Sequence, residues 1–156
     1  MRRPVKILWT KNNLPLSHLI CAVTKEPVSH VALCQNGKVL HATITGVVLL
    51  PEAEFRKKNQ VVFELTDWVE ASWFTTQITK WRGSPYDVGA ILFLGLSLLL
   101  RRVFKLPLPK SNLWQSSGMF LCTEWATLVV DGKTNPLITP YGLYLQVLKR
   151  INSRLK

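Results

Sequence analysis

One stretch decides the fold: Val28-Ser29-His30-Val31-Ala32-Leu33-Cys34-Gln35-Asn36-Gly37-Lys38-Val39-Leu40-His41-Ala42-Thr43. Two apolar and β-branched runs flank Asn-Gly, a pair typical of a two-residue hairpin turn. With Asn and Gly in the turn, Gln35 pairs with Lys38 and Ala32 pairs with His41. Side chains alternate between the faces of a strand, so His30 and His41 share one face as diagonal neighbours. The stretch therefore predicts a β-hairpin that brings two of the chain's three histidines together.

The flanking sequence predicts an α+β fold, because strand-like and helix-like patterns both occur along the chain. Strands are expected at Val5–Thr10, from Lys38 through Ile44 to Gly46, at Val47–Leu50 and at Gln60–Leu65. Helices are expected at Leu14–Val23, Trp68–Trp81, Met119–Val130 and Pro140–Ile151, with one helical turn at Pro51–Phe55. A connector rich in Pro, Ser and Asn covers Lys105–Gly118. The 156 residues suit a single domain, residues 1–156, with basic N- and C-terminal ends.

The start of the expected Trp68–Trp81 helix is read from a capping pattern. Thr66 or Asp67 is a suitable N-cap, and Glu70 follows Asp67 at the third position, which is the spacing of a capping box. Gly83-Ser84-Pro85 is expected to stop this helix.

An apolar segment follows within Tyr86–Phe104. Thirteen residues without charge run from Val88 to Leu100, well short of the roughly 20 needed to span a bilayer. Apolar side chains surround the whole helix, so it is either buried in the core or lies against a membrane or a partner. Both interpretations stay open.

The charge balance favours anionic partners. Lys and Arg number 20 against 9 Asp and Glu, which gives a net charge of +11. An anionic membrane, an anionic wall polymer or an acidic protein in a larger assembly fits this charge. Basic clusters at both ends more often mark solvated termini than a sequence-reading surface, so nucleic acid is the less favoured partner.

Cysteine usage and the N-terminus bear on location. Cys21, Cys34 and Cys122 form no CxxC pair and no even-numbered framework, which argues against a disulfide scaffold or a structural zinc site. Neither a signal peptide nor a transmembrane span is expected. A cytoplasmic or virion-associated location is therefore expected, with no cofactor and no metal.

Cys122 is the candidate nucleophile. It lies where Gln115-Ser116-Ser117-Gly118 gives way to the expected helix, and a thiol in a first helical turn is favoured as thiolate by the helix dipole. A thiolate also needs a base and a group that orients the base. His30 and His41 could fill these roles, although a buried packing cysteine and two core histidines explain the same residues.

The order of several motifs resembles that of a known hydrolase group. These motifs are Ser29-His30-Val31-Ala32-Leu33, Val39-Leu40-His41-Ala42, Gly83-Ser84-Pro85-Tyr86-Asp87, Phe120-Leu121-Cys122-Thr123-Glu124 and Thr139-Pro140. Together they look like the circularly permuted papain-like cysteine hydrolases, the YiiX-like branch of the NlpC-type superfamily, which is related to lecithin-retinol acyltransferase. The resemblance covers roughly residues 5–145.

The resemblance implies a permuted papain-like fold, in which a small antiparallel sheet packs against helices and the nucleophile opens a helix. It makes Cys122 the nucleophile, His30 the general base and His41 the residue that orients the base. Many YiiX-like members have an acid where His41 stands, whereas the acyltransferase branch has a histidine. The Tyr86-Asp87 pair matches the bacterial branch without a derived role.

The resemblance implies a thiol hydrolase that cleaves an amide bond, with a peptide linkage in bacterial cell-wall peptidoglycan as the expected substrate. An acyltransferase or lipid hydrolase at a membrane surface is the alternative, favoured by His41, the Val88–Leu100 segment and the basic charge. A structural module of a bacterial or phage assembly that retains the hydrolase fold is the third interpretation.

Overall fold

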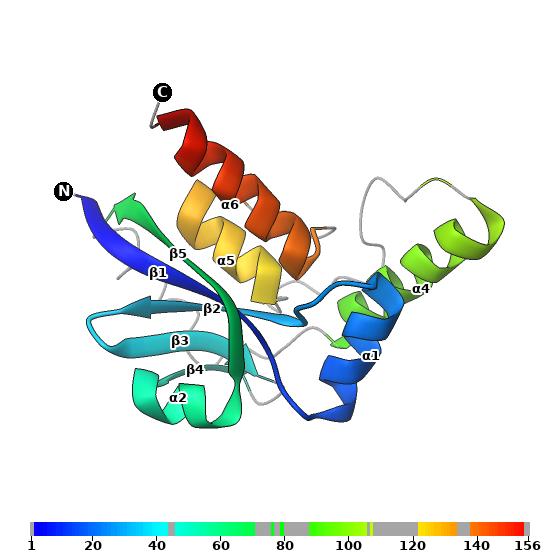
Figure 1. The fold of residues 1–156 in the computed structure, drawn as a ribbon, viewed down its shortest axis with the longest axis horizontal. Helices are drawn as coiled ribbons and strands as arrows, with labels where there is room; N and C mark the ends of the chain where they lie inside the picture. Colours follow the sequence, from blue (N-terminus) through cyan, green and yellow to red (C-terminus); the bar gives the residue numbers. More distant parts are fainter. Residues whose placement is uncertain are drawn as a thin grey trace.

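The protein has an α+β fold built on an open, five-stranded antiparallel sheet (Figure 1). The computed structural model describes residues 2–43, 46–70, 76, 79, 88–105, 107, 122–133 and 138–154. The strands are β1 (Arg2–Lys11), β2 (His30–Gln35), β3 (Lys38–Thr43), β4 (Gly46–Pro51) and β5 (Gln60–Glu70), in the spatial order β4-β3-β2-β1-β5. The helices are α1 (Pro15–Thr24), α2 (Glu52–Lys58), α4 (Val88–Phe104), α5 (Cys122–Asp131) and α6 (Pro140–Arg154).

The β2–β3 hairpin has the predicted register. Gln35 pairs with Lys38 and Ala32 with His41. Asn36 and Gly37 both have positive φ, 51° and 72°, which is the backbone of a type I′ turn. Because this turn matches the twist of the strands, the local sequence is sufficient to set the pairing.

Two apolar clusters divide the sheet into its two faces. One face carries Val5, Ile7, Trp9 and Leu33 of the central strands and is covered by α5 and α6. The other face carries Leu8, Ala32, Cys34 and Val39 and is covered by Phe55 of α2. We name them the α5 face and the α2 face. Alternation along β2 and β3 places His30 and His41 on the α2 face.

The expectation of a helix beginning at Trp68 is wrong. β5 continues through Trp68 and Val69 to Glu70, because this segment pairs with Arg2–Pro4 at the start of β1. The Asp67 carboxylate accepts hydrogen bonds from the backbone N–H of Trp68 and from Arg150 and Arg154 of α6. It therefore caps no helix here, and the remainder of the expected helix falls mostly outside the described residues.

Other boundaries differ by a few residues. β1 is longer than the expected Val5–Thr10, since its first residues pair with β5. β3 ends at Thr43, and Gly46 already belongs to β4. The expected turn at Pro51–Phe55 is the beginning of a longer helix, α2, which ends at Lys58 with three basic residues in its last turn.

α4 contains the apolar segment and extends from the body of the molecule beside α1 (Figure 1). Its C-terminal turn carries Arg101 and Arg102, followed by Val103 and Phe104, which are 60% and 65% exposed. Across the described residues, no helix has both the length and the apolar character that a membrane span requires.

Candidate functional site

The two hairpin histidines are in direct contact. His30 Nε2 lies 3.3 Å from His41 Nδ1, and the two rings meet edge to face with centroids 5.4 Å apart. The His41 ring also packs edge-on against Phe55 of α2, at 5.0 Å between centroids. His30 therefore has one ring nitrogen engaged by His41, while Phe55 fixes the position of the His41 ring.

Both imidazoles are neutral at pH 7. Desolvation by burial, with a contribution from the neighbouring His41, lowers the pKa of His30 to about 3. Desolvation lowers the pKa of His41 to about 4. A neutral imidazole holds one hydrogen, so one of the two rings donates the bond and the other accepts it.

The histidine pair is expected to make the fold sensitive to mild acid. Between the ordinary histidine pKa of about 6.5 and these lowered values, the unfolded chain binds protons that the folded chain does not, so stability falls as the pH drops. Urea unfolding from pH 7 to about pH 4.5 should show a smaller loss of stability in His30→Gln/His41→Gln than in wild type. Equal pH dependence in the two proteins would contradict the lowered pKa values of the two histidines.

Cys122 opens α5 and is buried, with 4% of its surface exposed. It packs in the apolar cluster that includes Val31, Leu33 and Trp125, which is the cluster of the α5 face. The histidine rings lie on the α2 face. The structure thus brings His30 and His41 together and places the Cys122 side chain among residues of the opposite face.

Cys122 nevertheless lies at the end of the sheet where His30 begins β2. The other end of α5 is held beside the C-terminal part of α6, where Asp131 bonds Gln146 and Arg150. Val129, Val130 and Gly132 also line a pocket with Arg2 and Glu70, at the edge where β1 starts. Ten helical residues span about 15 Å, so the first residue of α5 lies toward the opposite end, where Thr10 pairs with His30.

The remaining residues of the motifs that resemble the hydrolases lie in different surroundings or outside the described residues. Tyr86 and Asp87 lie outside the described residues. Glu124 is fully buried in the first turn of α5. Thr139 precedes α6, where its hydroxyl accepts a hydrogen bond from the N–H of Gly142 and donates one to Glu26. Thr139 is therefore a helix cap that also ties α6 to the segment before the hairpin.

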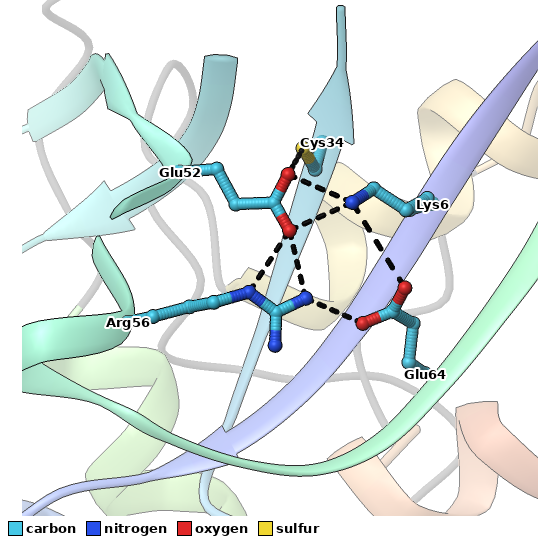
Figure 2. A network of polar contacts seen from close by, with 5 residues as sticks. All are labelled: Lys6, Cys34, Glu52, Arg56 and Glu64. Carbon is cyan, nitrogen blue, oxygen red and sulfur yellow. Dashed lines mark hydrogen bonds and ion pairs between the residues drawn. The ribbon is translucent and has the colours of Figure 1, made fainter. Parts of the chain in front are cut away.

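A polar network on the α2 face was missed from the sequence (Figure 2). Both carboxylate oxygens of Glu52 lie 2.7 Å from Lys6 Nζ, and Cys34 Sγ donates to Glu52 Oε2 at 3.1 Å. Arg56 bonds Glu52 through two nitrogens and also Glu64. Lys6 and Glu52 are 46 positions apart, so only the three-dimensional fold brings them together.

This network makes Cys34 a poor nucleophile. Burial, then the hydrogen bond to Glu52, raises the pKa of the Cys34 thiol to about 12. The hydrogen bonds from Lys6, Cys34 and Arg56 lower the pKa of Glu52 to about 2. Cys34 shares the face of the histidines, but it remains a protonated packing residue.

Comparisons of the chain with protein-family models, with curated proteins and with solved structures found no match. The likeness to permuted papain-like hydrolases therefore stays a hypothesis carried by short motifs of this sequence. Within the described residues, no group of three or more His, Cys, Asp and Glu side chains is arranged to hold a metal ion.

Proposed function

We propose that the chain is a thiol hydrolase with a permuted papain-like fold, in which Cys122 attacks an amide carbonyl. His30 is the general base and His41 orients it. The observation that carries the proposal is the 3.3 Å contact between two neutral imidazoles on adjacent strands. A base held in one orientation by a second polar group is what a cysteine nucleophile requires.

The contact is compatible with the tautomer that the mechanism needs. With its hydrogen on Nε2, His30 donates to His41 Nδ1 and keeps its own Nδ1 as the acceptor for the Cys122 thiol proton. Desolvation makes the isolated ring a weak base, but a thiolate that forms beside it stabilises the imidazolium. The ring is therefore neutral before the substrate arrives and takes the proton of the Cys122 thiol as the sulfur attacks.

The chemical steps follow from these positions. The thiolate adds to the carbonyl carbon, and the backbone N–H of Cys122 stabilises the oxyanion. Protonation of the leaving nitrogen by the His30 imidazolium breaks the carbon–nitrogen bond and leaves a thioester. His30 then takes a proton from water, whose oxygen attacks the thioester and releases the acid and the Cys122 thiol.

The proposal makes one structural demand. Cys122 packs with the α5 face, whereas the histidine rings lie on the α2 face. The Cys122 sulfur must therefore reach the His30 ring by passing the end of the sheet where β2 begins. The position of Cys122 at that end of the sheet supports such an approach. A change of the Cys122 rotamer or a shift on substrate binding then brings the sulfur into contact with the His30 ring.

We propose a peptide linkage of bacterial peptidoglycan as the substrate. The motif order around Cys122 and the net charge of +11, which suits an anionic wall, support this choice. Purified muropeptides incubated with the protein should yield a new amine and a new carboxylate at one peptide bond, identified by mass spectrometry. Intact muropeptides after incubation with a correctly folded protein would remove this substrate.

A second candidate function, an acyltransferase or lipid hydrolase at a membrane surface, uses the same residues. It is favoured by the end of α4, where exposed Val103 and Phe104 follow Arg101 and Arg102. Apolar side chains beside cations suit an anionic lipid surface, where the apolar groups enter and the cations meet headgroups.

Vesicle binding is expected to depend on the end of α4. Phe104→Glu places a charge where an apolar contact is proposed, so co-sedimentation with anionic vesicles should fall several-fold. Lys149→Glu, an exposed position on α6, serves as the control for a general loss of positive charge. Wild-type protein that stays in the supernatant while cleaving muropeptides would exclude the lipid function.

A further inference from the structure

A basic cavity lies apart from the histidine pair, between two connections of the fold. It is bounded by the segment where β1 leads into α1, by the segment where α2 leads into β5, and by α1 with the residues after it up to Pro27; its volume is about 720 Å³. Four cationic side chains and one carboxylate, that of Glu26, line it; the cations are Lys11, Arg56, Lys57 and Lys58. A cavity of this size accepts a small organic molecule.

Hydrogen bonds hold the two sides of the cavity together. The Asn12 amide donates to Asn59 Oδ1 at 3.1 Å, which joins the two connections directly. Asn59 in turn donates to the carbonyl of Phe55, and the Asn12 N–H donates to Ser17 Oγ. Ser17 also shares a 2.6 Å hydrogen bond with Ser29. These hydrogen bonds fix the polar floor of the cavity, while the lysine side chains at its rim are exposed.

The cations of the cavity differ in what they already bind. Arg56 is committed to Glu52 and Glu64, and Lys58 lies 3.8 Å from Glu54 in an exposed pair. Among the described residues, no ion pair involves Lys11 or Lys57. The dipole of α2 accounts for basic residues in its last turn, but not for Lys11, which arrives from β1.

We propose that this cavity binds a phosphate ester of a polar molecule, such as a sugar phosphate or a nucleotide. Lys11 and Lys57, from separate segments, supply charge for the phosphate. The amides of Asn12, Asn13 and Gln60 suit the hydroxyl and ring groups of the remainder. The lining contains no large apolar side chain, so an acyl chain has no place in it. The proposal depends neither on Cys122 nor on the histidine pair.

Calorimetry with AMP tests the proposal directly. Wild-type protein should bind AMP, and the affinity should fall as salt rises. Lys11→Gln/Lys57→Gln should weaken binding at least tenfold. Lys38→Gln/Lys149→Gln removes the same charge from exposed positions outside the cavity and should change the affinity less than twofold. Thermal unfolding of each variant confirms that the fold is retained.

Cys21 reports where the ligand binds, because its thiol lines the cavity and is partly exposed. AMP should slow the reaction of Cys21 with N-ethylmaleimide, measured by mass spectrometry. Binding that leaves this reaction unchanged puts the ligand elsewhere and overturns the proposal.

A second arm distinguishes a free phosphate ester from a lipid headgroup. Vesicles of phosphatidylcholine with phosphatidic acid present the same phosphate at a surface. Binding lost in the Lys11→Gln/Lys57→Gln variant but kept in Phe104→Glu supports the cavity, with a headgroup as its ligand. If wild type binds neither AMP nor these vesicles, or if the double variant binds both as wild type does, the proposal is wrong.

Discussion

Replacing Cys122 with alanine is expected to lower kcat/KM for amide cleavage by at least ~10³-fold, because the variant lacks the atom that forms the thioester. Cys122→Ser keeps a similar shape with a far weaker nucleophile and should also be inactive. His30→Gln should lose activity to a comparable degree, since nucleophile and base act as a unit. Rates are measured on the muropeptide or acyl substrate that wild type processes.

Cys21→Ala is the matched control, because it removes another thiol outside the proposed catalytic group. It should retain wild-type activity. Cys122 is buried, so the folding of Cys122→Ala is checked by urea unfolding before the rates are compared. A folded Cys122→Ala protein that cleaves at the wild-type rate would rule out the proposed nucleophile.

The second large effect concerns Asp67. Its carboxylate, in a residue that is 2% exposed, bonds Arg150 and Arg154 and so ties the end of β5 to α6. Among the described residues, Asp67→Ala leaves Asp131 as the one acidic partner of the partly buried Arg150 guanidinium. Breaking a buried ion pair from one side costs about 3 kcal/mol or more in the free energy of unfolding. Urea unfolding at neutral pH measures this loss.

Lys58→Ala is the comparison for Asp67→Ala. Lys58 and Glu54 form an exposed pair at 3.8 Å, whose removal should cost less than about 0.5 kcal/mol. Asp67→Leu combined with Arg150→Met replaces the charges by apolar groups and should recover much of the lost stability. A loss below about 1 kcal/mol in Asp67→Ala would show that the carboxylate is not the link between β5 and α6.

The hairpin could be predicted because its determinants are local. Asn36 and Gly37 select the turn, the turn sets the register, and the register places His30 and His41 on one face. The same reasoning failed at Asp67, where an acid followed by Glu70 fits both a capping box and the end of a long strand. Pairing with the first residues of β1 decides between the two, and that contact joins residues more than 60 positions apart.

The candidate site was predictable in part for the same reason. The contact between the histidines follows from one hairpin, whereas the position of Cys122 depends on how α5 packs against the sheet. The hydrophobic periodicity of the sequence does not indicate which face of the sheet α5 covers. The Glu52 network and the basic cavity also bring together residues more than 40 positions apart in the sequence. The sequence shows where basic residues cluster, but it does not show which of them form ion pairs in the folded protein.

The most direct test of the central claim is the rate at which Cys122 is alkylated by a thiol electrophile, in wild type and in His30→Gln. Mass spectrometry assigns the modified residue, and Cys21 provides an internal reference. The proposed site predicts selective labelling of Cys122 that slows markedly in His30→Gln, with the Cys21 rate unchanged. Absent labelling of Cys122, or an equal rate in both proteins, would contradict a Cys122–His30 site and favour a structural module that retains the fold.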